Sequence, residues 1–253
     1  MPSRQEICDY VAGLFSGCRF QDHSNNGLQV EGKNDVNRVA FAVDACQRVF
    51  TQAAAGKFDL LLVHHGMSWG GGIKMVSSYH AERLKTLLGH GISLLAYHLP
   101  LDAHPEFGNN AVLSNLLGLE QREPFFPYDG DTIGFCGQLP AAQAPAELCA
   151  RLEKALGGRC LTLPAPGNPP VRRLGIVSGG GGEAIEYCRQ QRLDCLLTGE
   201  IGHQHVHYAW ELGLTVIAAG HYATETTGVQ ALQKKIAAAF PVACEFLDCP
   251  TGL

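Results

Sequence analysis

This chain of 253 residues lacks the features of a membrane or secreted protein. No apolar run approaches the roughly 20 residues that a helix needs to cross a bilayer. The opening stretch MPSRQEICDYVAGLF has neither a sustained apolar core nor a small-residue cleavage site, so it resembles an amphipathic helix rather than a secretory signal. We therefore expect a cytoplasmic protein without a membrane partner.

The chain also has no surplus of basic residues. It holds 19 Lys and Arg against 24 Asp and Glu, which gives a formal net charge of −5. Affinity for nucleic acid depends on Lys and Arg, so an undirected nucleic-acid binder is disfavoured, although a local basic patch stays open. With 46% hydrophobic and 17% charged residues, the composition is that of a globular protein with one large domain or two small lobes.

No CxxC pair occurs among the ten cysteines. Cys8, Cys46, Cys188 and Cys195 lie in apolar patterns typical of helices or strands. We interpret them as buried thiols of a cytosolic protein. A zinc or disulfide framework built on cysteine is the alternative.

Two glycine- or histidine-rich stretches fall short of known motifs. SGGGGEAI (178–185) is neither GxGxxG nor GxxxxGK[ST], so it indicates either a tight turn or a helix start that contacts an anion. TGEIGHQHVHYA (198–209) is not HExxH, although His203 and His207 would share one face of a helix. Surface or interface histidines explain this second stretch better than a second metal site does.

What the chain does contain is an internal repeat. Val36 matches Val171 and Asp59 matches Asp194, both at an offset of 135 residues (171 − 36 and 194 − 59). Apolar runs at 38–43 and 59–63 hardly alternate with polar residues, as in strands that are covered on both faces. Helical patterns separate the strands, and the same order recurs after the proline-rich stretch LPAPGNPP.

The repeat predicts an α/β fold made of two related lobes, each a mixed sheet flanked by helices. The first lobe would comprise residues 1–123, and the second residues 124–253 with the connecting segment 124–170. Open α/β sheets bind ligands at the ends of their strands, so we expect a site between the lobes. The remaining expected elements are a loop at 21–32, a strand pair at 131–139, and helices at 4–16, 45–57, 78–90, 109–117, 145–156, 183–192, 203–212 and 226–239.

Residues of the kinds that bind metal ions follow the apolar runs. His64 and His65 come directly after LLLV. Neighbours in a strand point to opposite faces, so both rings reach one site only if the backbone leaves the strand there, which Gly66 permits. Two partly buried histidines bonded to backbone are the alternative for this doublet alone.

One further pair of such residues follows the third strand of each half. His98 and Asp102 come after ISLLAY, and Pro100 between them predicts a tight corner rather than a helix face. His221 and Glu225 occupy a matching place after VIAAG. Three imidazoles and two carboxylates, with His98 in reserve, suit two ions bridged by a carboxylate. Nitrogen and oxygen ligands favour zinc, iron or manganese over calcium.

On these motifs the chain resembles the Nif-three-like family, whose members are often called GTP cyclohydrolase 1 type 2 homologs. The motifs are NNGLQVEG (25–32), LLLVHHG (60–66), YHLPLDAHPEFGNN (97–110), the GGGG turn, LLTGE (196–200) and AGHYATE (219–225). The resemblance implies a two-lobed α/β fold, a dinuclear metal site and a ring-shaped homohexamer.

It further implies how the residues divide between the two divalent ions. His65 and Asp102 would hold one ion, His64 and His221 the other, with Glu225 bridging and His98 close by.

The leading functional hypothesis is therefore a metal-dependent hydrolase, in which a metal-bound hydroxide attacks a small-molecule substrate such as a nucleotide or similar heterocycle. His98 or Glu200, which aligns with His65 in the repeat, would transfer protons. The alternative is a non-catalytic metal-binding scaffold or interaction protein. No cluster of basic residues for phosphate stands out in the sequence, which favours the scaffold over nucleotide chemistry.

Overall fold

A computed structural model describes residues 1–253 as two compact units. The first unit contains Met1–Leu101 and Val229–Cys249, and the second contains Asp102–Gly228 and Pro250–Leu253. The chain passes from one unit to the other inside the short helix α4 (Leu99–Ala103), again inside α9 (His221–Ala239), and a third time between Cys249 and Pro250. The predicted lobes 1–123 and 124–253 describe the repeat, and that division stays a prediction.

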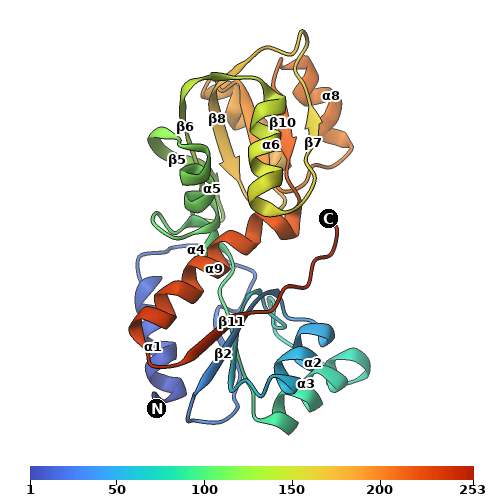
Figure 1. Ribbon diagram of the computed structural model, residues 1–253. Helices are drawn as coiled ribbons and strands as arrows, with labels where there is room; N and C mark the ends of the chain where they lie inside the picture. The colour runs from blue at the N-terminus through green and yellow to red at the C-terminus, as the bar shows by residue number, and fades with distance from the viewer. The chain divides into compact units, whose positions relative to one another are not determined.

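The first unit is built on a five-stranded sheet in the order β1-β4-β3-β2-β11. Its strands are parallel except β1, which runs antiparallel to β4. Figure 1 shows α2 and α3 on one side of β2 and α1 on the other. Its elements are α1 (Arg4–Leu14), β1 (Gly27–Val30), β2 (Arg38–Asp44), α2 (Gln47–Ala55), β3 (Leu60–His65), α3 (Ser78–His90), β4 (Ser93–Ala96) and β11 (Ala243–Phe246).

The core of this unit follows from the two-sided cover of its sheet. Phe50 of α2 and Leu87 of α3 pack with Leu61 and Val63 of β3, and all four side chains are fully buried. The side chains of a strand alternate between faces, so the neighbouring Leu60 and Leu62 face the side on which α1 lies. Both faces of β3 are therefore apolar until the strand reaches its histidines.

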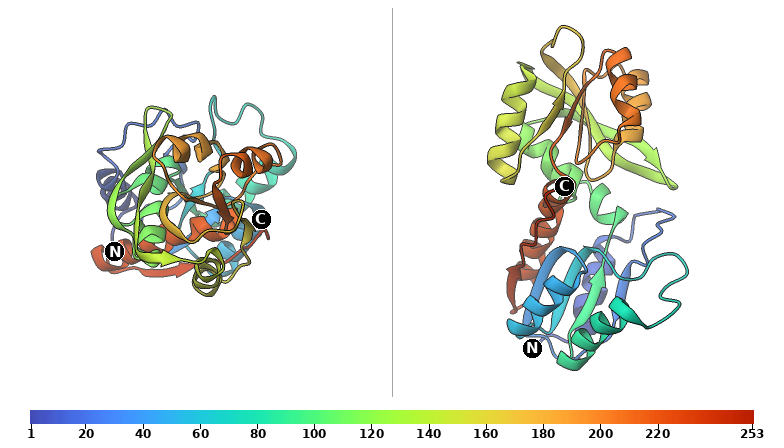
Figure 2. Two further views of the ribbon diagram at one scale, coloured as in Figure 1. Left: turned by 90° about the horizontal axis from the view of Figure 1, so that it is seen from above. Right: turned by 90° about the vertical axis from the view of Figure 1, so that its right-hand side faces the viewer.

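The second unit is built on a six-stranded sheet in the order β5-β6-β8-β9-β10-β7. β8, β9 and β10 are parallel, whereas β5, β6 and β7 pair antiparallel with their neighbours. Helices α6 and α8 lie on opposite sides of this sheet (Figure 2). Its elements are α5 (Asn109–Leu117), β5 (Glu120–Tyr128), β6 (Asp131–Gln143), α6 (Pro145–Leu156), β7 (Leu161–Leu163), β8 (Val171–Val177), the 3-10 turn η1 (Gly182–Ala184), α7 (Ile185–Gln190), β9 (Cys195–Thr198), α8 (Gln204–Glu211) and β10 (Thr215–Ala218).

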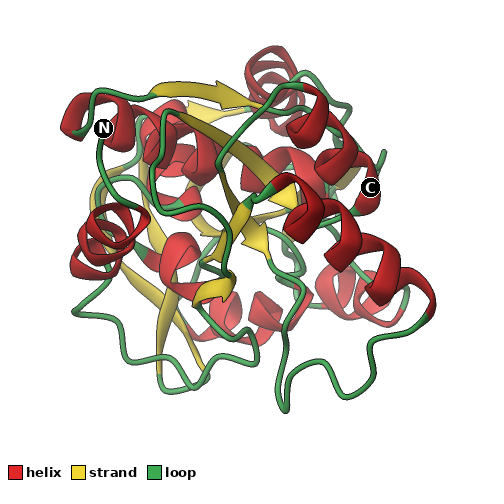
Figure 3. Cartoon of the chain, turned by 90° about the horizontal axis from the view of Figure 1, so that it is seen from below, coloured by secondary structure: helices red, strands yellow, loops and turns green.

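These two sheets confirm the predicted fold class, a mixed α/β protein whose sheets are flanked by helices (Figure 3). The order β1-β4-β3-β2 in the first sheet corresponds to β7-β10-β9-β8 in the second. In each, three parallel strands follow a short antiparallel strand that precedes them in the chain. The repeat thus includes an antiparallel edge strand that its sequence does not reveal.

The repeated aspartates have a structural role in each sheet. Asp59 accepts hydrogen bonds from the backbone amides of Asn37 and Arg38 at 2.9 and 3.2 Å, where β2 begins. Asp194 accepts equivalent bonds from the amides of Arg172 and Arg173 at 2.9 and 2.7 Å, at the start of β8. Each carboxylate therefore ties the beginning of one parallel strand to the beginning of the next.

Several local predictions were wrong. The segment 21–32, predicted as a loop, contains β1, and the strand pair predicted within 131–139 is instead β6 paired with the preceding β5. The corner between His98 and Asp102 is a single helical turn, α4. Proline is tolerated in the first turn of a helix, where its missing N–H has no partner to lose, so Pro100 starts this helix rather than preventing it.

All ten cysteines are free thiols, and the burial predicted for Cys188 and Cys195 is confirmed, whereas that predicted for Cys8 and Cys46 is wrong. Burial raises the pKa of the Cys188 and Cys195 thiols, which keeps both protonated and unreactive. Cys8 and Cys46 are only partly buried. None of the helices has both the length and the apolar character needed to cross a membrane.

Replacing Asp194 by alanine should destabilise the second unit. Two amide donors at the start of β8 would lose a charged acceptor, so we expect the free energy of unfolding to fall by about 2 kcal/mol, measured by urea denaturation. Asp194→Asn keeps one acceptor oxygen and should lose less. Glu211→Ala, at an exposed helix end, is the control and should change stability by under about 0.5 kcal/mol. Equal losses in Asp194→Ala and Glu211→Ala would refute the role assigned to Asp194.

Candidate metal centre

Three histidines cluster at the carboxyl ends of β3 and β4 in the first unit. One ring nitrogen of each of His64, His65 and His98 lies within 4.8 Å of the others. The ring centroids are 4.6 to 5.5 Å apart. His64 is fully buried, and the other two side chains are each 21% exposed. Both histidines of the doublet thus reach one place, because β3 ends at them.

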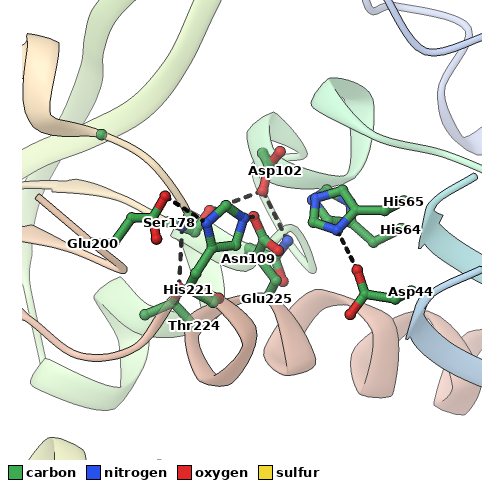
Figure 4. A network of polar contacts seen from close by, with 12 residues as sticks. Asp44, His64, His65, Asp102, Asn109, Ser178, Glu200, His221, Thr224 and Glu225 are labelled. Carbon is green, nitrogen blue, oxygen red and sulfur yellow. Dashed lines mark hydrogen bonds and ion pairs between the residues drawn. The ribbon is translucent and has the colours of Figure 1, made fainter. Parts of the chain in front are cut away.

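Each of these rings is held at Nδ1 by an oxygen that can only accept a hydrogen bond. His64 Nδ1 lies 3.1 Å from the backbone oxygen of Tyr97. His65 Nδ1 lies 2.8 Å from Asp44 Oδ1, a contact that the strand register sets because Asp44 in β2 pairs with His65 in β3 (Figure 4). His98 Nδ1 lies 2.9 Å from Asp22 Oδ1.

This bonding pattern decides the tautomer of all three rings. A carbonyl or carboxylate oxygen can only accept a hydrogen bond, so Nδ1 carries the hydrogen and a neutral ring has its lone pair on Nε2. Histidines that bind metal ions are oriented in the same way by an acceptor on their second nitrogen. The three imidazoles and the oxygen atoms that orient them therefore fit a transition-metal ion such as zinc, iron or manganese.

The polar segment before β1 fixes His98. Burial alone would raise the pKa of Asp22, but hydrogen bonds from His98, Asn26 and the Ser24 amide lower it to about 2. Asn26 also accepts a bond from the His98 amide at 2.8 Å. Asp22 is consequently an anion at neutral pH, and this loop holds His98 from both its ring and its backbone.

Gln29 in β1 braces the turn that follows the doublet. Its Oε1 accepts from the amides of Met67 and Ser68 at 2.7 and 3.0 Å. A Cβ at Gly66 would lie 2.4 Å from the Gln29 amide group, so only glycine allows this approach. The motifs NNGLQVEG and LLLVHHG thus support each other.

In the second unit Asp102 is buried and held by two donors. Ser178 Oγ and Asn109 Nδ2 each donate to its Oδ1 at 2.8 Å (Figure 4). Asn109 is itself fixed by the Gly228 amide, which donates to its Oδ1 at 2.6 Å. A carboxylate oxygen of Asp102 lies within 4.8 Å of one of Glu225. These contacts hold the Asp102 carboxylate in one orientation.

His221 begins α9 and contacts two acidic side chains. Its Nε2 lies 3.1 Å from Glu225 Oε1, and its Nδ1 lies 3.2 Å from Glu200 Oε1 (Figure 4). The hydrogen bond with Glu225 is the main cause that raises the pKa of His221 to about 9. Glu225 is only 3% exposed, whereas the Glu200 side chain is 51% exposed. The local environment is thus strongly favourable for a cation.

The glycine turn after β8 makes room for this pair. Gly179 has φ +61°, and a Cβ there would lie 2.3 Å from Glu225 Oε1 and 3.2 Å from His221 Nε2. Two of the turn's amides donate within the unit, Gly179 to Thr224 Oγ1 and Gly181 to Thr198 Oγ1. Of the two interpretations of SGGGGEAI, these contacts support the tight turn.

The candidate residues from the sequence therefore form two donor sets. The first unit supplies His64, His65 and His98, and the second supplies Asp102, His221 and Glu225 with Glu200 beside His221. His203 and His207 are exposed and belong to no group of potential ligands.

Sequence reasoning missed the residues that position the ligands, notably Asp22, Asp44, Asn109 and Ser178. A signal existed for Asp44, which ends its apolar run as His65 and Glu200 end theirs.

Fold and site together define a class, the α/β proteins with imidazole and carboxylate groups gathered at strand ends. A family model described as Duf34/NIF3 (NGG1p interacting factor 3) matches residues 2–251. The chain belongs to this family, as its motifs predicted.

Relatives named GTP cyclohydrolase 1 type 2 homolog match nearly the full length of this chain. The GTP cyclohydrolase 1 type 2 homolog of Pyrococcus horikoshii is 46% identical over 250 residues, which cover 99% of each chain. The protein of the same name from Deinococcus radiodurans is 41% identical, covering 99% of this chain and 94% of its own. A solved structure described as protein ybgI, of unknown function, superposes with a TM-score of 0.92 at 34% identity, covering 99% of this chain and 100% of its own.

Replacing Gly179 by alanine should damage the carboxylate set. The added Cβ would collide with Glu225, and the left-handed backbone would cost about 1–2 kcal/mol for a residue other than glycine. We expect a lower unfolding midpoint and less bound metal per chain after reconstitution with zinc, iron or manganese, measured by elemental analysis.

Gly180→Ala is the matched control for this prediction. A Cβ at Gly180 has no neighbour nearer than 3.7 Å, and its φ lies outside the left-handed region. Its metal content and midpoint should equal those of the unmodified chain. If the two variants behave alike, the close approach at Gly179 has no bearing on metal binding.

Proposed function

We propose that this protein is a metal-dependent hydrolase that acts on a nucleotide or similar heterocycle, with two divalent ions of zinc, iron or manganese per chain. Its ligands would be His64, His65, Asp102, His221 and Glu225. The observation that carries the proposal is the bonding of three clustered imidazoles, each oriented at Nδ1 by an acceptor so that Nε2 presents its lone pair.

The two donor sets complement each other chemically. The first unit offers imidazoles alone, whereas the second offers two carboxylates and one imidazole. A pair of ions needs a bridging group, and a carboxylate such as that of Glu225 can provide one. Since His98 and Asp102 are only four residues apart in the chain, we assign both sets to one centre.

Bound divalent ions would lower the pKa of a water molecule toward neutrality and so supply a nucleophile. The chain's own residues would prepare the site for this chemistry. Asp22 and Asp44 accept hydrogen bonds from Nδ1 of His98 and His65, which orients Nε2 of each ring as the candidate ligand atom. Glu200 is half exposed and bonds His221, so it is our candidate for accepting a proton, and His98 is the second.

The substrate class rests on the relatives. Proteins called GTP cyclohydrolase 1 type 2 homolog are 41% and 46% identical to this chain over nearly its whole length. Such an activity would open the purine ring of GTP and release formate. The scaffold hypothesis is the competing outcome of the test that follows.

Turnover and metal content test this proposal together. The protein, reconstituted separately with zinc, iron and manganese, would be incubated with GTP and related nucleotides while formate is measured. We expect about two ions per chain and formate release in at least one metal form. His64→Ala and Glu225→Ala should each lose metal and activity, because each removes a ligand.

His203→Ala controls for the loss of a histidine that is exposed and outside every donor group. It should retain metal and turnover. Absence of bound metal after reconstitution would rule out the metal centre. Full metal content without turnover in any form, with the ligand variants losing only assembly, would favour the scaffold.

The ring-shaped homohexamer remains part of the proposal. Sedimentation velocity at micromolar concentration should give a mass about six times that of one 27.2 kDa chain. A monomer under these conditions would contradict it.

A further inference from the structure

The first unit contains a cavity of about 610 Å³ beside the histidine cluster. Its wall runs from the turn after β3 into the first turns of α3 and includes Trp69, Lys74, Tyr79, His80 and Arg83. This volume lies within the range of about 300–1,000 Å³ that is usual for sites of small ligands. Nothing in the sequence motifs or the relatives' names assigns a role to it.

The cavity is basic in a chain that is acidic as a whole. Lys74 and Arg83 both line it, and neither forms an ion pair. No Asp or Glu is among its lining residues, although the chain carries a formal net charge of −5. Two unpaired cations without a counter-charge in one hollow favour an anionic ligand.

Two further polar groups at this cavity, a histidine nitrogen and a helix start, lack hydrogen-bond partners. An anion could supply these partners. The Nδ1 atom of His80 is buried and has no hydrogen-bond partner. Helix α3, of 13 residues, begins there, and the side chain of its N-cap Ser77 does not cap it. Backbone amides at such a helix start bind phosphate oxygens well.

Aromatic rings lie beside these donors. Tyr79 is 58% exposed, and the guanidinium of Arg83 lies 5.1 Å from the centre of its ring. Trp69 lines the cavity, and its ring centroid is 5.1 Å from that of His98 and 6.2 Å from that of His65. Exposed rings of this kind stack on bases. Trp69 therefore forms a wall shared by the cavity and the histidine cluster.

We infer that this cavity binds the phosphate groups of a nucleoside phosphate whose base lies along Trp69 toward the histidine cluster. Lys74 and Arg83 pair with the phosphates, and the start of α3 donates amide hydrogens to them. Only the reaction of the base rests on the proposed function. The binding of the phosphate groups in the cavity does not depend on it. Phosphate recognition was not visible in the sequence because Lys74 and Arg83 are nine positions apart, in a loop and in a helix.

Calorimetric titration of the full chain, with metal content measured in parallel, tests this inference. The probes are GTP, inorganic tripolyphosphate and guanosine. We expect GTP and tripolyphosphate to bind and guanosine to bind far more weakly. Lys74→Ala and Arg83→Ala should each raise the Kd for both anions about tenfold, because each loses one charged contact.

Lys85→Ala is the matched control. Lys85 is on the same helix, is not part of the cavity wall, and pairs with Glu82. This variant should bind the anions with unchanged Kd, and all three variants should keep the metal content and unfolding midpoint of the unmodified chain. Failure of both anions to bind, or an equal loss in Lys85→Ala, would overturn the inference.

The result also separates this inference from the proposed function. If GTP binding depends on Lys74 and Arg83 but no metal form releases formate, the cavity stands and the hydrolase proposal fails. If formate is released with the same KM in Lys74→Ala and Arg83→Ala as in the unmodified chain, the hydrolase stands and the cavity assignment is wrong.

Discussion

The orientation of the clustered histidines is the constraint on which the candidate site depends. Each imidazole needs an acceptor at Nδ1, and the fold provides three from different segments. Asp44 comes from the neighbouring parallel strand, the Tyr97 carbonyl from the end of β4, and Asp22 from the segment before β1. Strand register decides the first contact, because β2 and β3 pair Asp44 with His65. The pairing of β2 with β3 thus determines which nitrogen of His65 is the candidate ligand atom.

The candidate metal ligands of the second unit are positioned by close packing rather than by strand register. Glu225 lies so near the backbone of Gly179 that a single methyl group would displace it. The same turn is tied down through Thr224 and Thr198, whose hydroxyls accept its amide hydrogens. Asp102 depends on Asn109, which depends in turn on an amide of α9. A small change in any of these contacts would move a carboxylate.

The sequence predicted the fold class, because apolar strands and the helical patterns between them follow simple periodicity. The sequence-based prediction failed where an element is short or where its residues are typical of a different kind of structure. β7 has three residues, and β1 lies in a segment rich in Asn, Gln and Gly. Pro100 suggested a corner although it is compatible with a helix start. Asp22 was missed because only a tertiary contact brings it to His98, and Asp44 because its contact with His65 depends on the strand register.

The position of β11 bears on how the protein forms during synthesis. β11 pairs with β2, yet all of the second unit's sheet lies between them in the chain. While the ribosome makes residues 45–242, the outer edge of β2 has no neighbouring strand, and an unpaired edge invites association with other chains. The second unit can complete its sheet once residue 218 has emerged, so the sheet that begins first is completed last. The order in which the two sheets can be completed is therefore the reverse of the order in which they begin.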